Sequence, residues 1–181
     1  MEHKITTDRL ILEPLCEDDI SFMKELILRP EAYYYDPEMA ETSEDIESDC
    51  EWFIQKTALL PDAGGIRWIV KHYDEKIGEV HVHCNWERTL EWELGYHFLK
   101  EHWGFGYATE AVRAVIQYVF TNFNINRLAA FTNANNVKSE TLLLRVGMIK
   151  DGCLREVRLA NGVYSDELVY SMLRREFIHT L

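Results

Sequence analysis

Apolar and polar residues alternate along several stretches of the chain, and this period of two predicts strands. One alternating run covers residues 7–14 and stops at a proline, and a short apolar run covers residues 127–132. Two final strands are expected on either side of Asn161-Gly162, because this dipeptide favours a tight hairpin turn. Three further runs follow one another: Ile66, Trp68, Val70; Val80, Val82, Cys84; and Leu90, Trp92, Leu94, Tyr96, Phe98, with a turn expected at residues 74–76 between the first two.

Apolar positions three and four residues apart predict four helices. The first opens with acidic residues 17–19 and ends at Pro30, and the second covers residues 43–58 after capping hydroxyl groups. The third follows residue 106, and the fourth covers residues 137–146 and ends at Gly147 in a left-handed turn. Residues 29–40, with three consecutive tyrosines and two prolines, predict a loop. The order of elements predicts a mixed α/β fold, with residues 1–181 as one domain.

Composition narrows the class of protein. The 181 residues are 47% apolar and 28% charged, as in a soluble globular domain, and no apolar run approaches the roughly 20 residues of a membrane helix. The first residues lack a hydrophobic signal region, so we expect a cytoplasmic protein. A net charge of −12 argues against nucleic-acid binding and favours cationic partners, although solubility alone also explains it. Four cysteines without a Cys-x-x-Cys pair predict buried free thiols.

A Gly-x-Gly turn at residues 104–106 joins an alternating strand to an amphipathic helix. Its two glycines allow close approach of the backbone to a ligand, and the first N–H groups of the helix carry the positive end of the helix dipole. Strand, turn and helix therefore predict a cradle for a phosphate-bearing ligand. The dinucleotide-binding pattern fails because it requires a third glycine, and the P-loop fails because no Gly-Lys-Ser/Thr follows.

Five motifs follow one another along the chain. They are Thr-Asp-Arg-Leu-x-Leu at residues 7–12, Glu93-Leu-Gly-Tyr96, Trp103-Gly-x-Gly-Tyr-Ala-Thr-Glu-Ala111, Asn136-x-x-Ser139 before Gly147, and Asn161-Gly162, Asp166, Tyr170 and Leu173-x-x-Glu-Phe177 in the terminal hairpin. With these motifs the chain resembles the GNAT superfamily of acetyl-CoA-dependent N-acetyltransferases, and within it the branch of ribosomal-protein N-terminal acetyltransferases. The resemblance covers nearly the whole chain and implies a twisted mixed sheet with helices on both faces. Trp103 stands where broader GNAT enzymes have Gln or Arg, and Phe105 where a basic residue is frequent.

The resemblance implies that acetyl-CoA is the donor and that its pyrophosphate binds the backbone of residues 104–109. Backbone groups at residues 97–99 would pair with the pantetheine arm, and one N–H there would stabilise the oxyanion. Asn136 would contact the arm and Ser139 would donate a proton to the leaving thiolate, while capping of the fourth helix remains open for both. Thr109 either binds the donor or caps its helix. The expected donor-binding residues are His97, Phe98, Leu99, Trp103, Gly104, Phe105, Gly106, Tyr107, Ala108, Thr109, Asn136 and Ser139.

An amine must lose a proton to attack a thioester, and a partly buried carboxylate with a raised pKa suits this role. Glu93 occupies the motif position and is the first candidate for the base; a solvated or salt-bridged carboxylate is the alternative. Glu156 is a second candidate, although Arg158 lies closer to the expected place. His97 lies on the same strand face, and we expect it either to shuttle a proton or only to pack against its neighbours on the half-buried strand. His81-x-His83 has no third ligand at a helpful spacing, so no metal is expected.

The implied reaction is direct attack of a primary amine in a ternary complex, because no cysteine is placed to form an acyl-enzyme. The acceptor is a protein N-terminus or a small cationic amine, and we expect the loop around Tyr33–Tyr35 and the helix at 43–58 to form its wall. No membrane or nucleic-acid partner is expected, and a homodimer is open because many relatives form dimers. Two alternatives remain: a CoA-binding or sensing module without catalysis, and a nucleotide-binding transferase.

Overall fold

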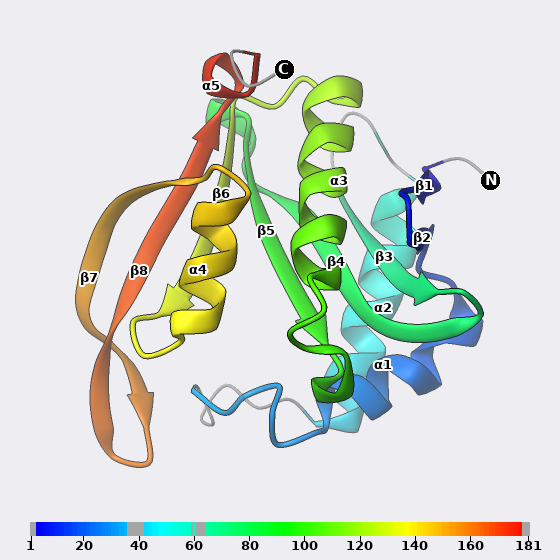
Figure 1. Ribbon diagram of the computed structural model, residues 1–181, viewed down its shortest axis with the longest axis horizontal. Coiled ribbons are helices and arrows are strands. Elements are labelled where there is room, and N and C mark those ends of the chain that lie inside the picture. Colours follow the sequence, from blue (N-terminus) through cyan, green and yellow to red (C-terminus); the bar gives the residue numbers. More distant parts are fainter. Residues whose placement is uncertain (1–2, 36–41, 59, 61–63, 179–181) are drawn as a thin grey trace.

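The computed structural model describes residues 3–35, 42–58, 60 and 64–178 of the chain. Its strands form one eight-stranded sheet in the order β1-β2-β3-β4-β5-β6-β8-β7 (Figure 1). Neighbouring strands are antiparallel except β5 and β6, which are parallel. The strands are β1 (Ile5–Thr6), β2 (Leu10–Pro14), β3 (Gly65–His72), β4 (Glu75–Trp86), β5 (Glu91–Phe98), β6 (Arg127–Asn133), β7 (Ile149–Ala160) and β8 (Val163–Leu173).

Helices cover both faces of this sheet, as predicted. The helices are α1 (Ile20–Ile27), α2 (Ser43–Thr57), α3 (Tyr107–Asn122), α4 (Val137–Arg145) and α5 (Arg174–Ile178), with short 3-10 turns at Glu17–Asp19, Glu87–Thr89 and Lys100–His102. Trp68 and Val70 of β3 pack in the core formed with α3 and α4, whereas Ile69 between them packs with α1 and α2. We call these two sides of the sheet the α3 face and the α2 face.

Three predicted boundaries were wrong. Residues 7–9 form a turn rather than the start of a strand, because the Thr7 N–H donates to the Leu10 carbonyl (2.9 Å) and the Leu10 N–H donates to Thr7 Oγ1 (3.0 Å). The turn expected at residues 74–76 begins one residue earlier, since Glu75 already pairs with His72. Only Leu173 of the closing motif lies in the terminal hairpin, because residues 174–178 form helix α5, in which Glu176 Oε2 accepts from the Leu173 N–H (2.8 Å).

Two predicted turns were correct, and one expectation about the cysteines was not. Gly147 ends α4 with φ of 92°, and Asn161 and Gly162 both have positive φ in the β7–β8 turn. Cys50 is buried, but Cys16 and Cys153 are exposed, so the prediction of buried thiols fails for those two; all four thiols are free. Within the described ranges, none of the helices is long and apolar enough to span a membrane.

The sheet divides where β5 and β6 meet. β5 pairs with β6 only through Glu91–Glu93, opposite Arg127–Ala129, and then continues to Phe98 beside β4. Beyond this point β6 continues to Asn133 beside β8. Residues 94–98 of β5 therefore have a described strand partner on one side only. We call this opening, which begins after Glu93, the fork.

Candidate functional site

The glycine turn leads directly into α3 beside the fork. Gly104 and Gly106 have φ of 85° and 82°, in the left-handed region that disfavours residues with a Cβ. A Cβ at Gly104 would meet no atom within 4 Å, so backbone conformation rather than crowding requires glycine there. Gly106 is the N-cap of α3, so Thr109 is not. A glycine cap leaves the first N–H groups of this 16-residue helix without a capping side chain, which makes them available to an anion.

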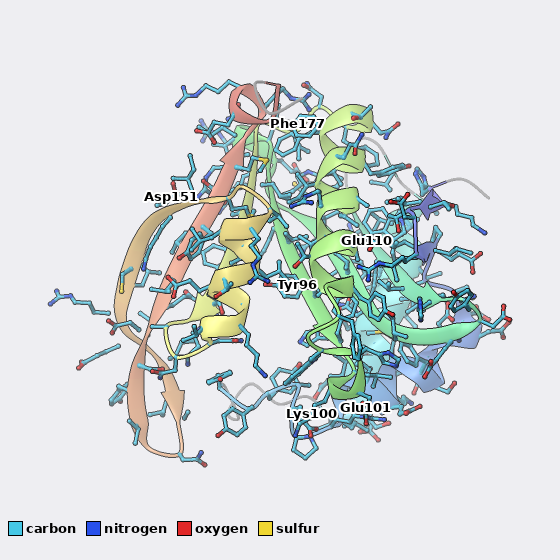
Figure 2. All side chains as sticks on the ribbon, in the orientation of Figure 1. Tyr96, Lys100, Glu101, Glu110, Asp151 and Phe177 are labelled. Atoms are coloured by element: carbon cyan, nitrogen blue, oxygen red, sulfur yellow. The ribbon has the colours of Figure 1, made fainter. Side chains whose placement is uncertain are left out.

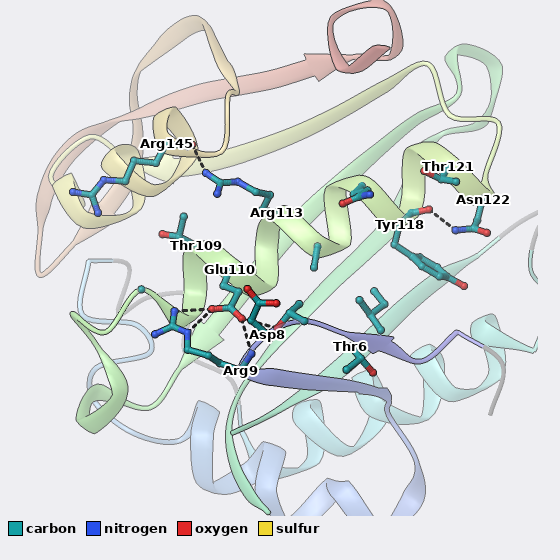
Figure 3. Close-up of a pocket in the computed structure, with 15 residues that line it drawn as sticks. Thr6, Asp8, Arg9, Thr109, Glu110, Arg113, Tyr118, Thr121, Asn122 and Arg145 are labelled. Atoms are coloured by element: carbon teal, nitrogen blue, oxygen red, sulfur yellow. Dashed lines mark hydrogen bonds and ion pairs between the residues drawn. The ribbon is translucent and has the colours of Figure 1, made fainter. Parts of the chain in front are cut away.

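An arginine–glutamate pair that the sequence analysis did not single out holds this turn in place (Figure 3). Arg9 donates from Nη1 to the Phe105 carbonyl (3.0 Å) and from Nε to Glu110 Oε2 (2.7 Å). Thr7 Oγ1 donates to the other Glu110 oxygen (2.6 Å). Burial alone would raise the pKa of Glu110, but the hydrogen bonds from Thr7 and Arg9 lower it. The only signal in the sequence was that both residues lie in the family motifs.

A groove of about 800 Å³ begins at this turn and follows the exposed side of α3. Arg9, Arg113 and Arg145 contribute to its lining, and Arg113 Nη2 donates to the Arg145 carbonyl (3.0 Å). Asp8 and Glu110 also line the groove, and Glu110 is paired with Arg9. Arg113 and Arg145 therefore outnumber the one remaining acidic side chain and leave a small excess of positive charge beside the turn.

The backbone of β5 presents hydrogen-bonding groups to the fork, but not all of them are free. The Leu99 N–H donates to the Ile77 carbonyl on the β4 side (3.0 Å). The Phe98 carbonyl accepts from Trp103 Nε1 (2.8 Å). In an antiparallel pair the N–H and C=O of one residue point to the same side, so the Phe98 N–H also faces away from β4. Of the backbone groups at residues 97–99, which the sequence analysis assigned to the pantetheine arm, the Phe98 N–H is therefore directed into the fork.

Two hydroxyl groups meet across the fork on the α3 face. Tyr96 Oη of β5 lies 2.7 Å from Ser139 Oγ in the first turn of α4. Asn136 is the N-cap of α4, and its Oδ1 accepts from the Ser139 N–H (3.1 Å), so the capping alternative holds for Asn136. Burial raises the pKa of Tyr96 to about 12, and the phenol stays neutral. Tyr96 is a site residue that sequence reasoning used only as part of a motif.

Lys138 connects α4 to the glycine turn, because its Nζ lies 4.4 Å from the centre of the Trp103 ring. Together with the contact between Tyr96 and Ser139, this places α4 against both β5 and the turn. In the view of Figure 2, Tyr96 lies between the ribbons of α3 and α4. Ser139 and Trp103, which the sequence predicted as donor-binding residues, therefore belong to one local assembly.

Glu93 lies on the α2 face at the start of the fork, opposite His83 of β4. Burial raises the pKa of its carboxyl, and the nearby charge of Glu167 adds to the effect. Its polar neighbours are Asn85 Nδ2 at 3.5 Å and His83 Nε2 at 4.0 Å. Glu91, two residues earlier, forms an ion pair with Arg127 instead. Glu93 thus has the partial burial and raised pKa expected of a base.

The second candidate base has a different environment. Glu156 is exposed, with φ of 55°, in a bulge of β7 between Leu154 and Arg158. Its backbone N–H donates to Asp166 Oδ1 (3.0 Å). Arg158 forms an ion pair with Glu167 of β8. Glu156 is thus exposed at a bulge, whereas Glu93 is half-buried beside the fork.

The segments expected to form the acceptor wall lie on the α2 face. The Tyr33 ring is centred 6.2 Å from the His97 ring, and the Tyr35 carbonyl accepts from Asn133 Nδ2 of β6 (2.9 Å). The tyrosine loop therefore reaches from β5 to β6 across the fork. Phe53 of α2 packs against His81, with ring centres 5.4 Å apart. Residues 36–40 of the expected loop lie outside the described residues.

Charged and imidazole side chains continue along this face. Glu79 of β4 is fully buried and lies within hydrogen-bond distance of His81 and His97. The Nδ1 atom of His81 is therefore occupied by a carboxylate. In the described part of the chain, no three His, Cys, Asp or Glu side chains lie together in a metal-binding arrangement.

Comparison with known proteins agrees with this geometry. Residues 9–149 match the family model described as an acetyltransferase (GNAT) domain. The chain is 32% identical over 173 residues to the uncharacterised N-acetyltransferase YoaA of Bacillus subtilis, covering 94% of this chain and 96% of that protein. The structure is similar to that of the ribosomal L7/L12 alpha-N-protein acetyltransferase RimL in complex with coenzyme A (TM-score 0.82, 16% identity, 94% and 98% coverage). It is also similar to a chimera of the Vibrio cholerae spermidine N-acetyltransferase SpeG (TM-score 0.79, 22% identity, 94% and 99% coverage).

Proposed function

The chain belongs to the GNAT acetyltransferase family and is therefore an N-acetyltransferase of this type, and we propose that it transfers the acetyl group of acetyl-CoA to a primary amine. The observation that carries the proposal is the fork beside the glycine-capped start of α3. An extended pantetheine arm fits the unpaired side of β5, and a pyrophosphate fits helix N–H groups at the turn. One ligand that needs both features is acetyl-CoA.

The donor would be held from both sides of the fork. The backbone of residues 104–109 would bind its pyrophosphate, and the arginines of the adjoining groove support the remaining negative charge. The Phe98 N–H would face the pantetheine arm or the developing oxyanion. The Asn136 side chain caps α4 with its oxygen, which leaves its amide nitrogen to the donor.

The amine would approach from the α2 face and attack the thioester carbonyl directly. Glu93 would accept a proton from the attacking nitrogen, because burial raises the pKa of its carboxyl and so makes the carboxylate a stronger base. The C–N bond forms, the C–S bond breaks, and the Ser139 hydroxyl would donate to the departing sulfur. Tyr96 lies 2.7 Å from Ser139 and would orient that hydroxyl.

We propose two classes of acceptor, a protein N-terminal amine and a small cationic amine. The structural neighbours named for a ribosomal-protein N-terminus and for spermidine support one class each, at identities that establish the fold alone. A net charge of −12 favours cationic acceptors of either class. The assignment to the branch of ribosomal-protein acetyltransferases is part of the same proposal.

The test is a panel of peptides with free N-terminal amines, polyamines, amino acids and aminoglycosides. Each is incubated with acetyl-CoA, thiol release is followed, and the acetylated product is identified by mass spectrometry. Stoichiometric thiol and acetylated amine support the proposal. Binding of acetyl-CoA without turnover of any amine would instead favour a CoA-binding module, and binding of ATP without acetyl-CoA would favour a nucleotide-binding transferase.

A further inference from the structure

A buried carboxylate on the α2 face holds two imidazole rings at once. His81 Nδ1 lies 3.0 Å from Glu79 Oε2, and His97 Nδ1 lies 2.8 Å from Glu79 Oε1. The His81 Nδ1 atom also lies 3.3 Å from Glu79 Oε1, so the two rings share this oxygen and His81 is closer to the other one. Glu79 has no exposed surface, whereas His81 retains 14% and His97 29% of its side-chain exposure. The cluster thus has a buried centre and two partly open ends.

The environment keeps Glu79 ionised. Burial alone would raise the pKa of its carboxyl, but the charge of His81 when that ring is protonated, the charge of Arg67 and the hydrogen bonds from both imidazoles hold this pKa well below its usual range. Arg67 Nε lies 3.3 Å from Glu79 Oε2, and the other end of the guanidinium is paired with Asp49 of α2. An ionised carboxylate only accepts hydrogen bonds, so both Nδ1 atoms carry the proton. In the neutral rings the Nε2 atoms are then bare acceptors.

Gly95 leaves room for the His81 ring. His81 and Gly95 are cross-strand partners, and a Cβ at residue 95 would lie 2.3 Å from His81 Nε2. The ring therefore covers the place where any other residue would carry a side chain. Gly95 is two residues beyond Glu93, on the same strand face, where β5 has just left β6. His81 Nε2 stands at the opening of the fork, on the side from which the amine would approach.

We propose that His81 is a second acid–base residue of the acetyl transfer, which takes the first proton from the incoming ammonium group, and that Glu79 is its positioning residue. This role rests on the proposed function. An ammonium acceptor loses two protons when it becomes an amide. The first passes to His81 Nε2 and leaves a neutral amine. The second passes to Glu93 as the C–N bond forms. Ser139 donates its hydroxyl proton to the sulfur as the C–S bond breaks and recovers a proton from Glu93 through solvent, while the proton on His81 is released to solvent.

The charged and titratable groups that face His81 come from three strands and one helix. They are Glu79 and His83 of β4, Arg67 of β3, Glu93 and His97 of β5, and Asp49 of α2, which is paired with Arg67. Among the described residues, only Glu79 forms a hydrogen bond with the Nδ1 atom of His81. A change at Glu79 therefore alters which nitrogen of His81 carries the proton.

The test combines a cavity variant with chemical rescue. His81→Gly removes the ring and leaves space for free imidazole, and we expect kcat/KM at pH 7 to fall about 100-fold with the most active acceptor of the amine panel. Added imidazole should restore at least part of this loss. The loss should shrink as the pH rises past the ordinary pKa of the acceptor amine, because a neutral amine no longer needs this step. His3→Gly is the matched control, since His3 Nδ1 also bonds a side chain, Tyr118 Oη at 2.7 Å, but packs against α3.

Two further measurements cover the case in which His81→Gly fails to fold. His81→Gln keeps a donor toward Glu79 but cannot accept a proton, so it should show the same loss without rescue. Nitrogen-15 NMR of the wild-type protein should find the Nδ1–H tautomer for His81 and His97. A wild-type protein that acetylates amines while His81→Gly and His81→Gln keep full kcat/KM, or a Nε2–H tautomer at His81, would overturn the role of His81 alone. A wild-type protein inactive with every amine would overturn the proposed function and this role together.

Discussion

At Gly104 and Gly106 the backbone has a left-handed conformation that no packing contact demands, and it turns the chain into α3 with its N–H groups exposed. Residues with a Cβ adopt this conformation at a cost of about 1–2 kcal/mol. Because the adjoining space is open, substitution at Gly104 changes the backbone rather than creating a clash. The turn can therefore be altered without disturbing the core.

We expect Gly104→Ala to lower the free energy of unfolding by about 1 kcal/mol and to weaken acetyl-CoA binding about tenfold. Gly162→Ala is its matched control, because Gly162 has φ of 76° and equally open surroundings but lies in the β7–β8 turn. Gly162→Ala should lose the same free energy of unfolding and keep the wild-type affinity for acetyl-CoA. Thermal denaturation and isothermal titration measure the two quantities. Equal affinities in the two variants would mean that the glycine turn does not bind the donor.

The carboxyl of Glu93 leads to a prediction about pH. Since burial raises its pKa, the acid limb of the pH profile of kcat/KM should have its midpoint above the ordinary glutamate value of about 4.3. Glu93→Gln should lower kcat/KM about 100-fold and remove this limb. Glu91→Gln serves as the control on the same strand face, because Glu91 is already neutralised by Arg127. An acid limb that persists in Glu93→Gln would assign the titration to another group.

At the scale of elements, the contacts of Arg9 join the turn before β2 to the first turn of α3. They fix the carbonyl of Phe105 and the side chain of Glu110 from the same guanidinium. The exposed surface of Arg9 means that this ion pair contributes little to global stability. Its effect is local, because it holds the conformation of the glycine turn relative to the sheet.

Arg9→Met should therefore raise the Kd for acetyl-CoA about tenfold, or about 1.4 kcal/mol, with a small change in melting temperature. Arg29→Met is a suitable comparison, because Arg29 also bonds two carboxylates, Glu25 and Glu101, but not the turn. Its Kd should match that of the wild type. Titration calorimetry distinguishes the two variants, and an unchanged Kd for Arg9→Met would contradict a role for this pair in shaping the donor site.

The elements were predictable to different degrees. Periodicity located the helices at residues 43–58 and 137–146 and the strand before the glycine turn, because each buries one regular face. It failed at residues 7–9, where the Thr7 side chain closes a turn inside an alternating pattern. It also missed α5, whose short length gives no period to detect. Local hydrogen bonds determine the backbone conformation at both places.

The site was less predictable than the fold, because its geometry depends on which strands are neighbours. The motifs pointed to Glu93, Ser139 and the glycine turn. They gave no reason to connect Tyr96 with Ser139, or Glu79 with His97, since these pairs are 43 and 18 residues apart. Cross-strand register and the position of α4 bring them together. Sequence spacing alone carries no information about either.

At the scale of the whole molecule, the buried cluster around Glu79 links stability to pH. A carboxyl whose pKa is lowered on folding stabilises the native state above its unfolded pKa of about 4.3, and this contribution is lost as the pH falls. Glu79→Gln should therefore cost about 3 kcal/mol near pH 7, since it leaves Arg67 without one of its partners. The difference from wild type should narrow below about pH 4.

Urea denaturation of both proteins between pH 7 and pH 3 measures this difference. Glu13→Gln is a control for carboxylates in general, because Lys4 and Lys71 lower the pKa of Glu13 to about 2 through hydrogen bonds at a more exposed position. Glu13→Gln should also lower the free energy of unfolding near pH 7, but by less than Glu79→Gln. A Glu79→Gln difference that does not change with pH would show that Glu79 is not the ionised centre of the cluster.

The central claim is that the fork and the glycine turn together bring acetyl-CoA to a primary amine. The most direct test is mass spectrometry of the amine and peptide panel after incubation with acetyl-CoA and the wild-type protein, with Gly104→Ala and Glu93→Gln in parallel. We predict an acetylated amine in the wild-type reaction and a strongly reduced amount with each variant. Bound acetyl-CoA without any acetylated amine, or equal product from all three proteins, would contradict the account.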